Sequence, residues 1–232
     1  MSRLFDGIDD GITVADDPAF EFTTSESYTL CAWVRHSSLT GYQNYFRKDD
    51  GFASPRRILG FRKNGVTNVI ECLLGTVGVD LQSFGGSTAL TTDTWYFVAL
   101  VRDVGADQIR LYLATASGDV TQEAAATDTT TTTHGENTRE LQIGREFSPG
   151  STATEVINGR MADVRVYGRA LTVNELRGVK HGVILDAPLG HWPLWGVASP
   201  EPDVSGNRRN GTVVGAVAAD HAPFGSYAGR AA

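Results

Sequence analysis

Cysteine is scarce in this sequence of 232 residues. The two cysteines, Cys31 and Cys72, lie in the apolar stretches YTLCAWV and NVIECLL, which suits small buried side chains better than metal ligands. A disulfide between them stays open, because pairing cannot be read from a sequence. Nothing in the cysteine usage requires an oxidising compartment.

Long apolar segments are also missing. The chain has no run of 18 apolar residues, and its first residues, MSRLFDGIDDG, hold no apolar core of a signal peptide. We therefore expect no membrane insertion and no signal peptide. The expected protein is made in the cytoplasm and is either displayed on a virion or released by lysis.

Basic residues are fewer than acidic residues in this chain. The chain has 20 Lys and Arg against 27 Asp and Glu, with a formal net charge of -7. Binding to a phosphate backbone needs clustered cations. Nucleic acid is therefore excluded as an expected partner.

Catalytic motifs are missing as well. The sequence has no Gly-x-Ser-x-Gly, no His-Glu-x-x-His and no Walker loop. A retaining glycosidase needs two carboxylates about 5 to 5.5 Å apart, which on a strand means alternate residues on one face. Glu201 and Asp203 have that spacing, but Pro200 and Pro202 argue against a central strand there. The sequence therefore predicts no enzyme.

What the sequence does contain is many short strand-like runs, with abundant Thr and 26 Gly. Most runs are bounded by Gly, Asp, Asn or Ser, and no convincing helix of ten residues separates them. The pattern predicts an all-β, two-sheet antiparallel β-sandwich. The runs are residues 11–15, 28–36, 56–63, 68–75, 94–103, 109–115, 140–146 and 161–168.

The stretch INGRMADVRVYGRALTVNEL combines two structures. Met161 to Tyr167 has the apolar pattern of a strand that ends at Gly168. Thr172 and Glu175 then have the spacing of a capping box, in which each side chain bonds a backbone donor at a helix start. We expect a last long strand followed by a short closing helical turn.

The Thr-rich segment TDTTTTTHG, residues 127–135, predicts an exposed edge strand or loop rather than disorder. After Leu176 the chain becomes rich in proline, which places an internal boundary near residues 177–182. We expect a sandwich over residues 1–181 and a C-terminal extension over residues 182–232.

Several of these pieces occur together in a known order. FDGIDDGITV, YTLCAWVRH, TDTWYFVALVRD, IRLYL, LQIGRE and the closing stretch cover residues 4–176. In this the chain resembles the laminin-G-like jelly rolls of the concanavalin A-like lectin/glucanase superfamily. The resemblance implies two antiparallel sheets packed face to face. The hydrolytic branch of that superfamily uses Glu-x-Asp-x-Glu, which this sequence lacks.

The C-terminal extension departs from the family pattern. HWPLWGVASPEPDVSGNRRNGTVVGAV resembles a segment that such domains carry before FDG, yet here it comes last. We infer that it supplies a strand in a circularly permuted manner, either to its own sandwich or to the edge of a neighbouring subunit.

No cofactor is required by these motifs, but calcium has a candidate site. Asp203, Ser205 and Asn207 resemble the start of a calcium loop without its bidentate Glu. A simple Asx turn at Asp203 explains the same residues. Asp163 is a further acidic candidate, as are Asp6, Asp9 and Asp10, for which turn hydrogen bonding is the alternative.

Binding of a glycan needs aromatic faces for sugar rings and polar groups for hydroxyls. The segment 36–57, expected to be a loop, and the C-terminal extension supply such side chains, although contact with a partner protein or docking of the extension would explain them equally. The candidate contact residues are Tyr42, Tyr45, Phe52, Arg56, Trp192 and Trp195.

The sequence thus predicts a non-enzymatic, lectin-like interaction protein. We expect a surface component of a virion, such as a decoration or tail-associated protein of a bacteriophage, with glycan adhesion as a further role. Its partners would be other protein subunits in a homo-oligomer or particle, and a cell-surface glycan. The alternative is a free-standing carbohydrate-binding module of a bacterium.

Overall fold

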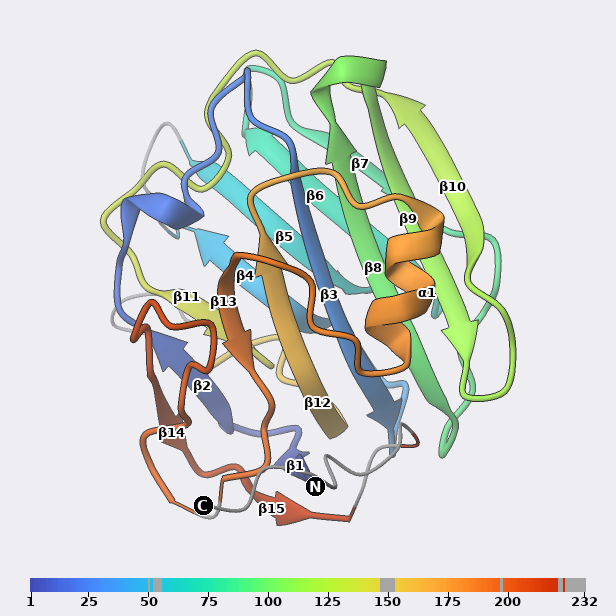
Figure 1. Cartoon of the computed structure of the whole chain (residues 1–232), viewed down its shortest axis with the longest axis vertical. Coiled ribbons are helices and arrows are strands. Elements are labelled where there is room, and N and C mark those ends of the chain that lie inside the picture. Colours follow the sequence, from blue (N-terminus) through green and yellow to red (C-terminus); the bar gives the residue numbers. More distant parts are fainter. Residues whose placement is uncertain (50, 52–55, 147–152, 197, 221–222, 224–232) are drawn as a thin grey trace.

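The computed structural model describes residues 1–49, 51, 56–146, 153–196, 198–220 and 223. Two antiparallel sheets lie face to face, and short loops and one α-helix join their strands (Figure 1). The prediction of an all-β, two-sheet sandwich is confirmed.

One sheet has eight strands. Seven follow one another in space, and β13 pairs with the second half of β12, in line with β1 on the first half. The spatial order is β10 (Thr121–Thr127), β9 (Gln108–Thr115), β8 (Trp95–Asp103), β3 (Tyr28–His36), β12 (Asn158–Tyr167), β1 (Ser2–Asp6) and β15 (Val217–Ala219), with β13 (Pro188–Trp192) beside β12.

The other sheet has seven strands. Their order is β14 (Gly211–Val214), β2 (Gly11–Val14), β11 (Leu141–Ile143), β4 (Gln43–Asp49), β5 (Arg57–Lys63), β6 (Ile70–Thr76) and β7 (Gln82–Gly85). Two short 3-10 helices, η1 (Pro18–Phe20) and η2 (Val104–Ala106), lie in the connections.

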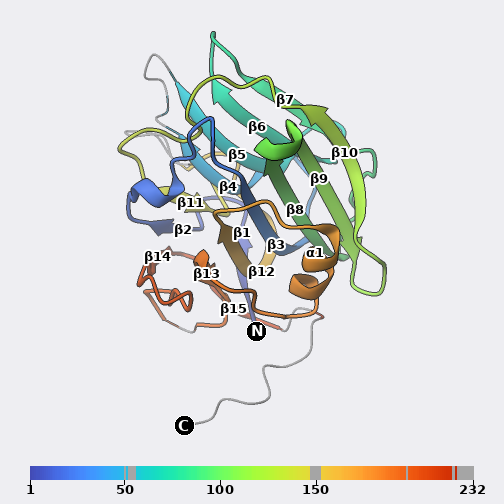
Figure 2. The same cartoon turned by 45° about the horizontal axis from the view of Figure 1, so that its top comes forward.

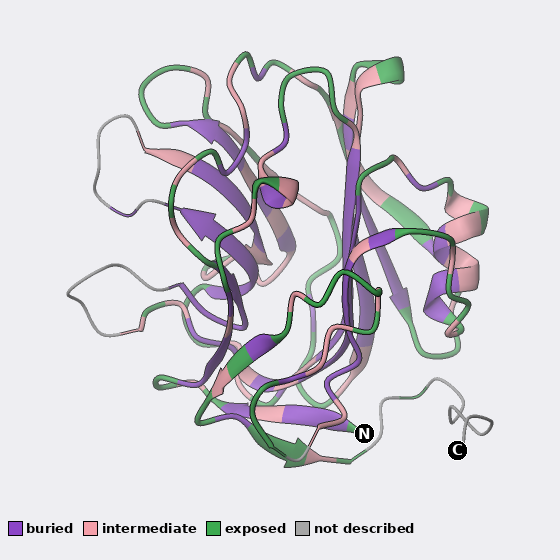
Figure 3. Cartoon of the chain, turned by 60° about the vertical axis from the view of Figure 1, so that its left-hand side comes forward, coloured by how far each residue is buried: buried purple, intermediate pink, exposed green. Residues whose placement is uncertain are grey.

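The main core fills the space between the sheets. Side chains alternate along each strand, so that every second residue faces the opposite sheet. Ile12 and Val14 of β2, and Leu59 and Phe61 of β5, are buried there against strands of the other sheet. Figure 3 shows the buried residues running along the strands of both sheets.

A second apolar cluster lies on the other side of the eight-stranded sheet, beneath α1 (Val173–Lys180). Leu176 and Val179 of the helix pack there against Trp33 and Phe97 of the sheet. The helix starts with the predicted capping box: the Thr172 backbone N–H donates to Glu175 Oε2 at 2.8 Å, and the Glu175 N–H donates to Thr172 Oγ1 at 3.3 Å. The expected closing helical turn is therefore present.

The C-terminal extension packs on its own chain. Its strands β13, β14 and β15 pair with β12, β2 and β1, beside the start of the chain (Figure 2). A buried ion pair fixes this arrangement, because Arg3 Nε lies 2.7 Å from Glu201 Oε2. The extension is thus part of the sandwich in this structure, while the domain boundary at residue 181 stays a prediction.

The Thr-rich segment is part strand and part loop. Strand β10 ends at Thr127, and the next residues are held by the carboxylates of Asp80 and Asp128. Both cysteines are buried and free, which settles the question of a disulfide between them. Among the described residues, no helix has the length and apolar character needed to cross a membrane.

Candidate functional site

The one α-helix of the described residues packs on the eight-stranded sheet, and none covers the outer face of the seven-stranded sheet. Strand register places one row of outward side chains across it, because residues paired on neighbouring strands point the same way. The row comprises Thr13, Gln142, Arg47, Gly60, Leu73 and Ser83.

Charged and amide side chains dominate this surface, which we call the polar face. It includes the strand residues Thr13, Asn44, Arg47, Asp49, Arg62, Glu71, Leu73 and Gln142, and the adjoining loop residues Tyr42, Arg56, Arg145, Glu146 and Glu155.

Arg47 lies in the middle of the polar face. It extends over Gly60, where a Cβ atom would stand 2.8 Å from Arg47 Nη1, so the glycine makes room for the guanidinium. Its Nη2 donates to Asp49 Oδ2, whereas Nε and Nη1 are buried without a hydrogen-bond partner in the described part of the chain. Leaving a buried donor unpaired costs about 1–3 kcal/mol, so such a group calls for an explanation.

Arg56 joins two carboxylates at one end of the polar face. Its Nη2 lies 2.6 Å from Asp49 Oδ2 and 2.7 Å from Glu146 Oε1. Burial raises the pKa of Glu146, a tendency that the nearby Arg47 opposes. The guanidinium of Arg56 therefore occupies the space between the two carboxyl groups.

Arg145 extends across the side nearer β2. Its Nε donates to Gln142 Oε1 at 3.0 Å, and its Nη2 donates to Thr13 Oγ1 at 3.0 Å. Burial lowers the pKa of Arg145, while the charges of Asp9 and Asp10 act in the opposite direction. These contacts fix the side chains of β2 and β11 in one network.

Tyr42 and Arg62 form the other end of the polar face. The guanidinium carbon of Arg62 lies 4.1 Å from the centre of the Tyr42 ring, within the range of a cation–π contact. Arg62 is held by Glu71 at 2.8 Å and by Glu155 at 3.0 Å. Asn44 Nδ2 donates to Glu155 Oε2 at 2.8 Å, but its Oδ1 is buried and has no partner among the described residues.

Two of the predicted contact residues, Tyr42 and Arg56, lie on this surface, but at its opposite ends. Tyr45 and Trp192 are both fully buried in the main core, so neither can contact a sugar or a partner. The Tyr45 hydroxyl bonds His36 Nε2, and Trp192 Nε1 donates to the Arg209 carbonyl. Trp195 follows β13 in the other sheet, and Phe52 lies outside the described residues.

The candidate calcium ligands Asp203, Ser205 and Asn207 belong to one hydrogen-bonded turn. Asp203 is the centre of an Asx turn, with Oδ1 accepting the His191 and Ser205 N–H groups and Oδ2 accepting the Ser205 hydroxyl and the Arg209 N–H. Asn207 Nδ2 donates to the Pro188 carbonyl. These hydrogen bonds form the Asx turn that was the alternative interpretation of the same residues, and calcium binding there stays a prediction.

Asp163 is buried in a separate network. Its carboxylate accepts hydrogen bonds from Arg165 at 2.9 and 2.7 Å and from His191 Nε2 at 2.7 Å. Burial acts to raise the pKa of Asp163, but the hydrogen bond from His191 and the charge of Arg165 hold it below its ordinary value. The contacts make Asp163 a structural anchor for β12 and β13.

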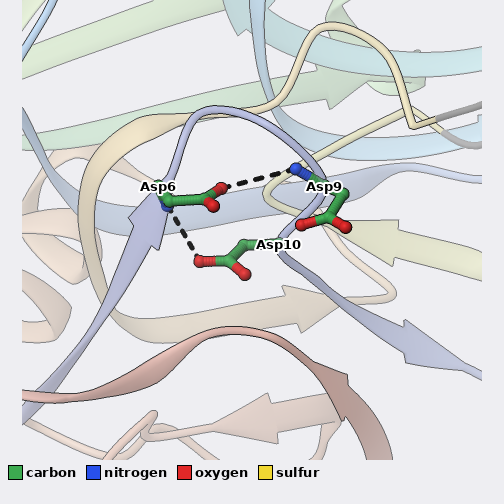
Figure 4. Close-up of side chains that lie close together, drawn as sticks. All are labelled: Asp6, Asp9 and Asp10. Carbon is green, nitrogen blue, oxygen red and sulfur yellow. Dashed lines mark hydrogen bonds between the residues drawn. The ribbon is translucent and has the colours of Figure 1, made fainter.

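Asp6, Asp9 and Asp10 form an acidic cluster in the β1–β2 turn (Figure 4). Their carboxylate oxygens lie within 4.8 Å of one another. Asp6 Oδ1 accepts the Ile8 and Asp9 N–H groups, and Asp10 Oδ2 accepts the Asp6 N–H at 2.8 Å. Burial raises the pKa of Asp10. The hydrogen bonds match the turn role that the sequence left open.

The sequence did not point to most of the polar face, including Asn44, Arg62, Glu146 and Glu155. The residues of β4, QNYFRKD, do not alternate between polar and apolar, so no simple pattern marks these side chains. Their convergence depends on strand register, which a single sequence does not reveal.

The fold was compared with known protein families, curated proteins and solved structures. The family model of the concanavalin A-like lectin/glucanases superfamily matches residues 6–177. A search of curated proteins found no match.

Among solved structures, a candidate carbohydrate-binding protein from Bacteroides ovatus has a TM-score of 0.70 at 19% identity, over 93% of this chain and 58% of that one. This chain therefore covers under two thirds of that relative. The carbohydrate-binding module CBM40 of the Ruminococcus gnavus IT-sialidase, bound to α2,3-sialyllactose, has a TM-score of 0.60 at 16% identity, over 78% of this chain and 98% of that one.

Tailspike protein 2 of an Escherichia coli O157:H7 bacteriophage is a weaker match. Its TM-score is 0.54 at 14% identity, over 83% of this chain and 30% of that one. Identities this low show a shared fold. Together with the family model over residues 6–177, they establish that the chain belongs to the concanavalin A-like lectin/glucanase superfamily.

Proposed function

We propose that the protein is a non-enzymatic, lectin-like carbohydrate-binding protein whose ligand lies on the polar face. One observation carries the proposal: on this sheet face, the partly exposed ring of Tyr42 lies against the Arg62 guanidinium, which is paired with the partly exposed carboxylate of Glu155. An exposed aromatic ring beside hydrogen-bonding groups is the arrangement that a sugar ring requires.

The chemistry of the face suits a sugar. Sugar hydroxyls both donate and accept hydrogen bonds, and the face offers guanidinium donors beside carboxylate and amide acceptors. Tyr42, which is 37% exposed, adds an aromatic surface at the edge. Neighbours of the same fold include a module bound to a sialylated sugar, which supports carbohydrate binding as the function of this architecture.

The absence of catalysis is part of the proposal. Asp49 and Glu146 are the carboxyl pair that most resembles a glycosidase site, and the raised pKa of Glu146 would suit a general acid. A glycosidic bond would have to lie between the two groups, but the Arg56 guanidinium is hydrogen-bonded to both of them there. The arrangement favours binding over hydrolysis.

Display on a virion stays a prediction from the sequence. The extension, which was expected to supply a strand to its own sandwich or to a neighbouring subunit, pairs within the same chain. The likeness to a tailspike protein concerns the fold. We therefore place glycan binding first, with virion display as the second candidate.

A glycan array followed by titration calorimetry tests the proposal. Leu73→Trp puts a large side chain in the centre of the polar face and should lower affinity for any array hit at least about tenfold. Val217→Trp is the matched control, because Val217 is 56% exposed on β15 of the other sheet. Equal binding by the wild type and the Leu73 variant, or no binding to any glycan, would contradict the proposal.

A further inference from the structure

The end of the polar face around Tyr42 has its own chemistry. We call this group, Tyr42, Asn44, Arg62, Asn64, Glu71 and Glu155, the Tyr42 subsite. Its residues come from β4 and the residue before it, from β5 and the residue after it, from β6, and from the segment before β12.

The Tyr42 ring is positioned before any ligand arrives. Arg62 lies under it at 4.1 Å, and the backbone of Gly65 lies against its edge, where a Cβ atom would stand 2.9 Å from Tyr42 Cδ2. Arg62 is itself clamped by two carboxylates. A fixed and partly exposed aromatic ring loses little conformational freedom when a sugar ring stacks on it.

The charge of the subsite is negative. Arg62 is its one cation, and it is paired with both Glu71 and Glu155. Burial acts to lower the pKa of Arg62, but these two carboxylates hold it above its ordinary value. The side chains of Glu71 and Glu155 are 12% and 23% exposed, so an incoming anion would meet their charges at close range.

The other arginines of the polar face also have carboxylates close by, which balance their positive charge. Arg47 and Arg56 share the Asp49 and Glu146 carboxylates, two charges against two. Arg145 lies in the field of Asp9 and Asp10. An acidic ligand would therefore find no cation that lacks a nearby carboxylate in the described part of this surface.

The free hydrogen-bonding capacity at the subsite is mostly that of acceptors. The Glu71 and Glu155 side chains remain partly exposed, whereas Asn44 is fully buried beside Glu155 and lies out of reach of a ligand. The carboxylates of Glu71 and Glu155 accept hydrogen bonds but donate none when ionised. Acceptors of this kind match the hydroxyl donors of a sugar and repel a carboxylate or sulfate.

We propose that the Tyr42 subsite takes an uncharged sugar unit, which stacks on Tyr42 and donates hydroxyl hydrogen bonds to Glu155 and its neighbours. Sugars with a carboxylate or sulfate at this position are rejected. The inference rests on the proposed carbohydrate binding and narrows it to neutral saccharides, although a neighbour of the same fold holds a sialylated one.

An array of matched glycans tests this, each neutral oligosaccharide beside its sialylated, uronic-acid or sulfated counterpart. We expect the neutral members to bind at least about tenfold better, with an affinity that changes less than about twofold between 0.05 and 0.5 M NaCl. Preference for the acidic members would overturn this inference and leave the proposed function intact. No binding to any member would overturn both.

Substitutions in the Tyr42 subsite test whether it causes the preference for neutral sugars. Tyr42→Ala should weaken binding of a neutral hit about tenfold, whereas Tyr42→Phe keeps the ring and should bind within about twofold of the wild type. Glu155→Gln removes one negative charge and should raise affinity for the acidic counterparts several-fold relative to the neutral members. Arg177→Ala on α1, at the opposite side of the sandwich, is the control. If Tyr42→Ala leaves binding of the neutral hit unchanged, the subsite lies elsewhere on the polar face.

Discussion

At the scale of single residues, two buried histidines make the fold sensitive to acid. His36 bonds Gln43 and the Tyr45 hydroxyl, and His134 bonds the Tyr28 hydroxyl and Thr130. Burial lowers the pKa of His36 to about 4 and that of His134 to about 3. Both are therefore neutral in the folded protein at pH values where an unfolded histidine is charged.

This difference predicts a loss of stability in mild acid. Above the ordinary histidine pKa of about 6.5 neither state is charged, so the full stability is present. As the pH falls from about 6.5 towards 4, the two histidines bind protons in the unfolded chain but not in the folded chain. The free energy of unfolding therefore falls by up to about 1.4 kcal/mol per pH unit for each histidine. Urea unfolding at pH 7, 6 and 5 measures the slope.

His36→Gln should reduce that slope, because one of the two groups no longer titrates. His181→Gln is the control at an exposed position after α1. A wild-type free energy of unfolding that stays constant from pH 7 to 5 would contradict the argument.

The ion pair of Arg3 and Glu201 is the second residue-scale prediction. Both side chains are buried, at 2% and 0% exposure, and Arg3 also donates to the carbonyls of Ala198 and Ala216. Glu201→Ala leaves a buried charge without its counterion, so we expect a loss of about 3–5 kcal/mol in urea unfolding.

The exposed pair of Arg177 and Asp119 provides the matched comparison. Asp119→Ala should leave the unfolding midpoint almost unchanged, because water screens an exposed pair. If the two alanine variants are equally stable, the buried pair does not hold the extension in place.

At the scale of elements, strand β4 illustrates which parts of the fold the sequence could predict and which it could not. The apolar strands β3, β8 and β9 and the capping box of α1 are visible in residue patterns. Strand β4, QNYFRKD, carries charges on its outward side and was assigned to a loop. A shift in pairing between Asn44 and Phe46 turns both Tyr45 and Phe46 into the core, which simple alternation cannot foresee.

Prediction of the candidate site was limited in the same way, because it also depends on strand register. Tyr42 could be proposed because it is aromatic and lies between strands, whereas Arg47 and Arg62 are ordinary charged residues until register places them on one face. Trp192 fits the alternative of a docking residue of the extension, because β13 carries its side chain into the main core.

Gly60 of β5 offers an element-scale test. A Cβ atom there would stand 2.8 Å from Arg47 Nη1 and 3.4 Å from Leu73 Cβ. Gly60→Ala should displace Arg47 and cost about 1–3 kcal/mol in unfolding, and it should weaken binding of any glycan hit. Gly105→Ala is the control, since its nearest neighbour would be Asp103 Oδ1 at an ordinary 3.5 Å. Unchanged stability and binding in the Gly60 variant would contradict this prediction, because they would show that Arg47 can move aside without cost.

At the scale of the whole molecule, the C-terminal extension completes both sheets. It adds β14 to the edge of one sheet and β13 and β15 to the other, and it brings Trp192 and Leu194 into the main core. Removal of residues 182–232 should therefore abolish cooperative unfolding, since the loss of Trp192 alone exceeds the cost of a usual core substitution.

Circular dichroism with urea titration measures this, and light scattering on the full chain accompanies it. Because the extension packs in its own sandwich, full-length protein should not need strand exchange to stay folded on dilution. A truncated chain with an unaltered melting temperature, or a full-length protein that unfolds on dilution, would contradict this account.

The pairing of β1 with β15 also governs how the chain reaches its native state. Arg3 must meet Glu201, and Leu4 must meet Val217, across nearly the whole length of the polypeptide. Contacts that distant in sequence make folding slow, because a long loop must close before they form. During synthesis from β1 towards β15, the edges of β1 and β2 stay unpaired until the final strands emerge from the ribosome. Nascent chains should thus depend on chaperones that shield open sheet edges.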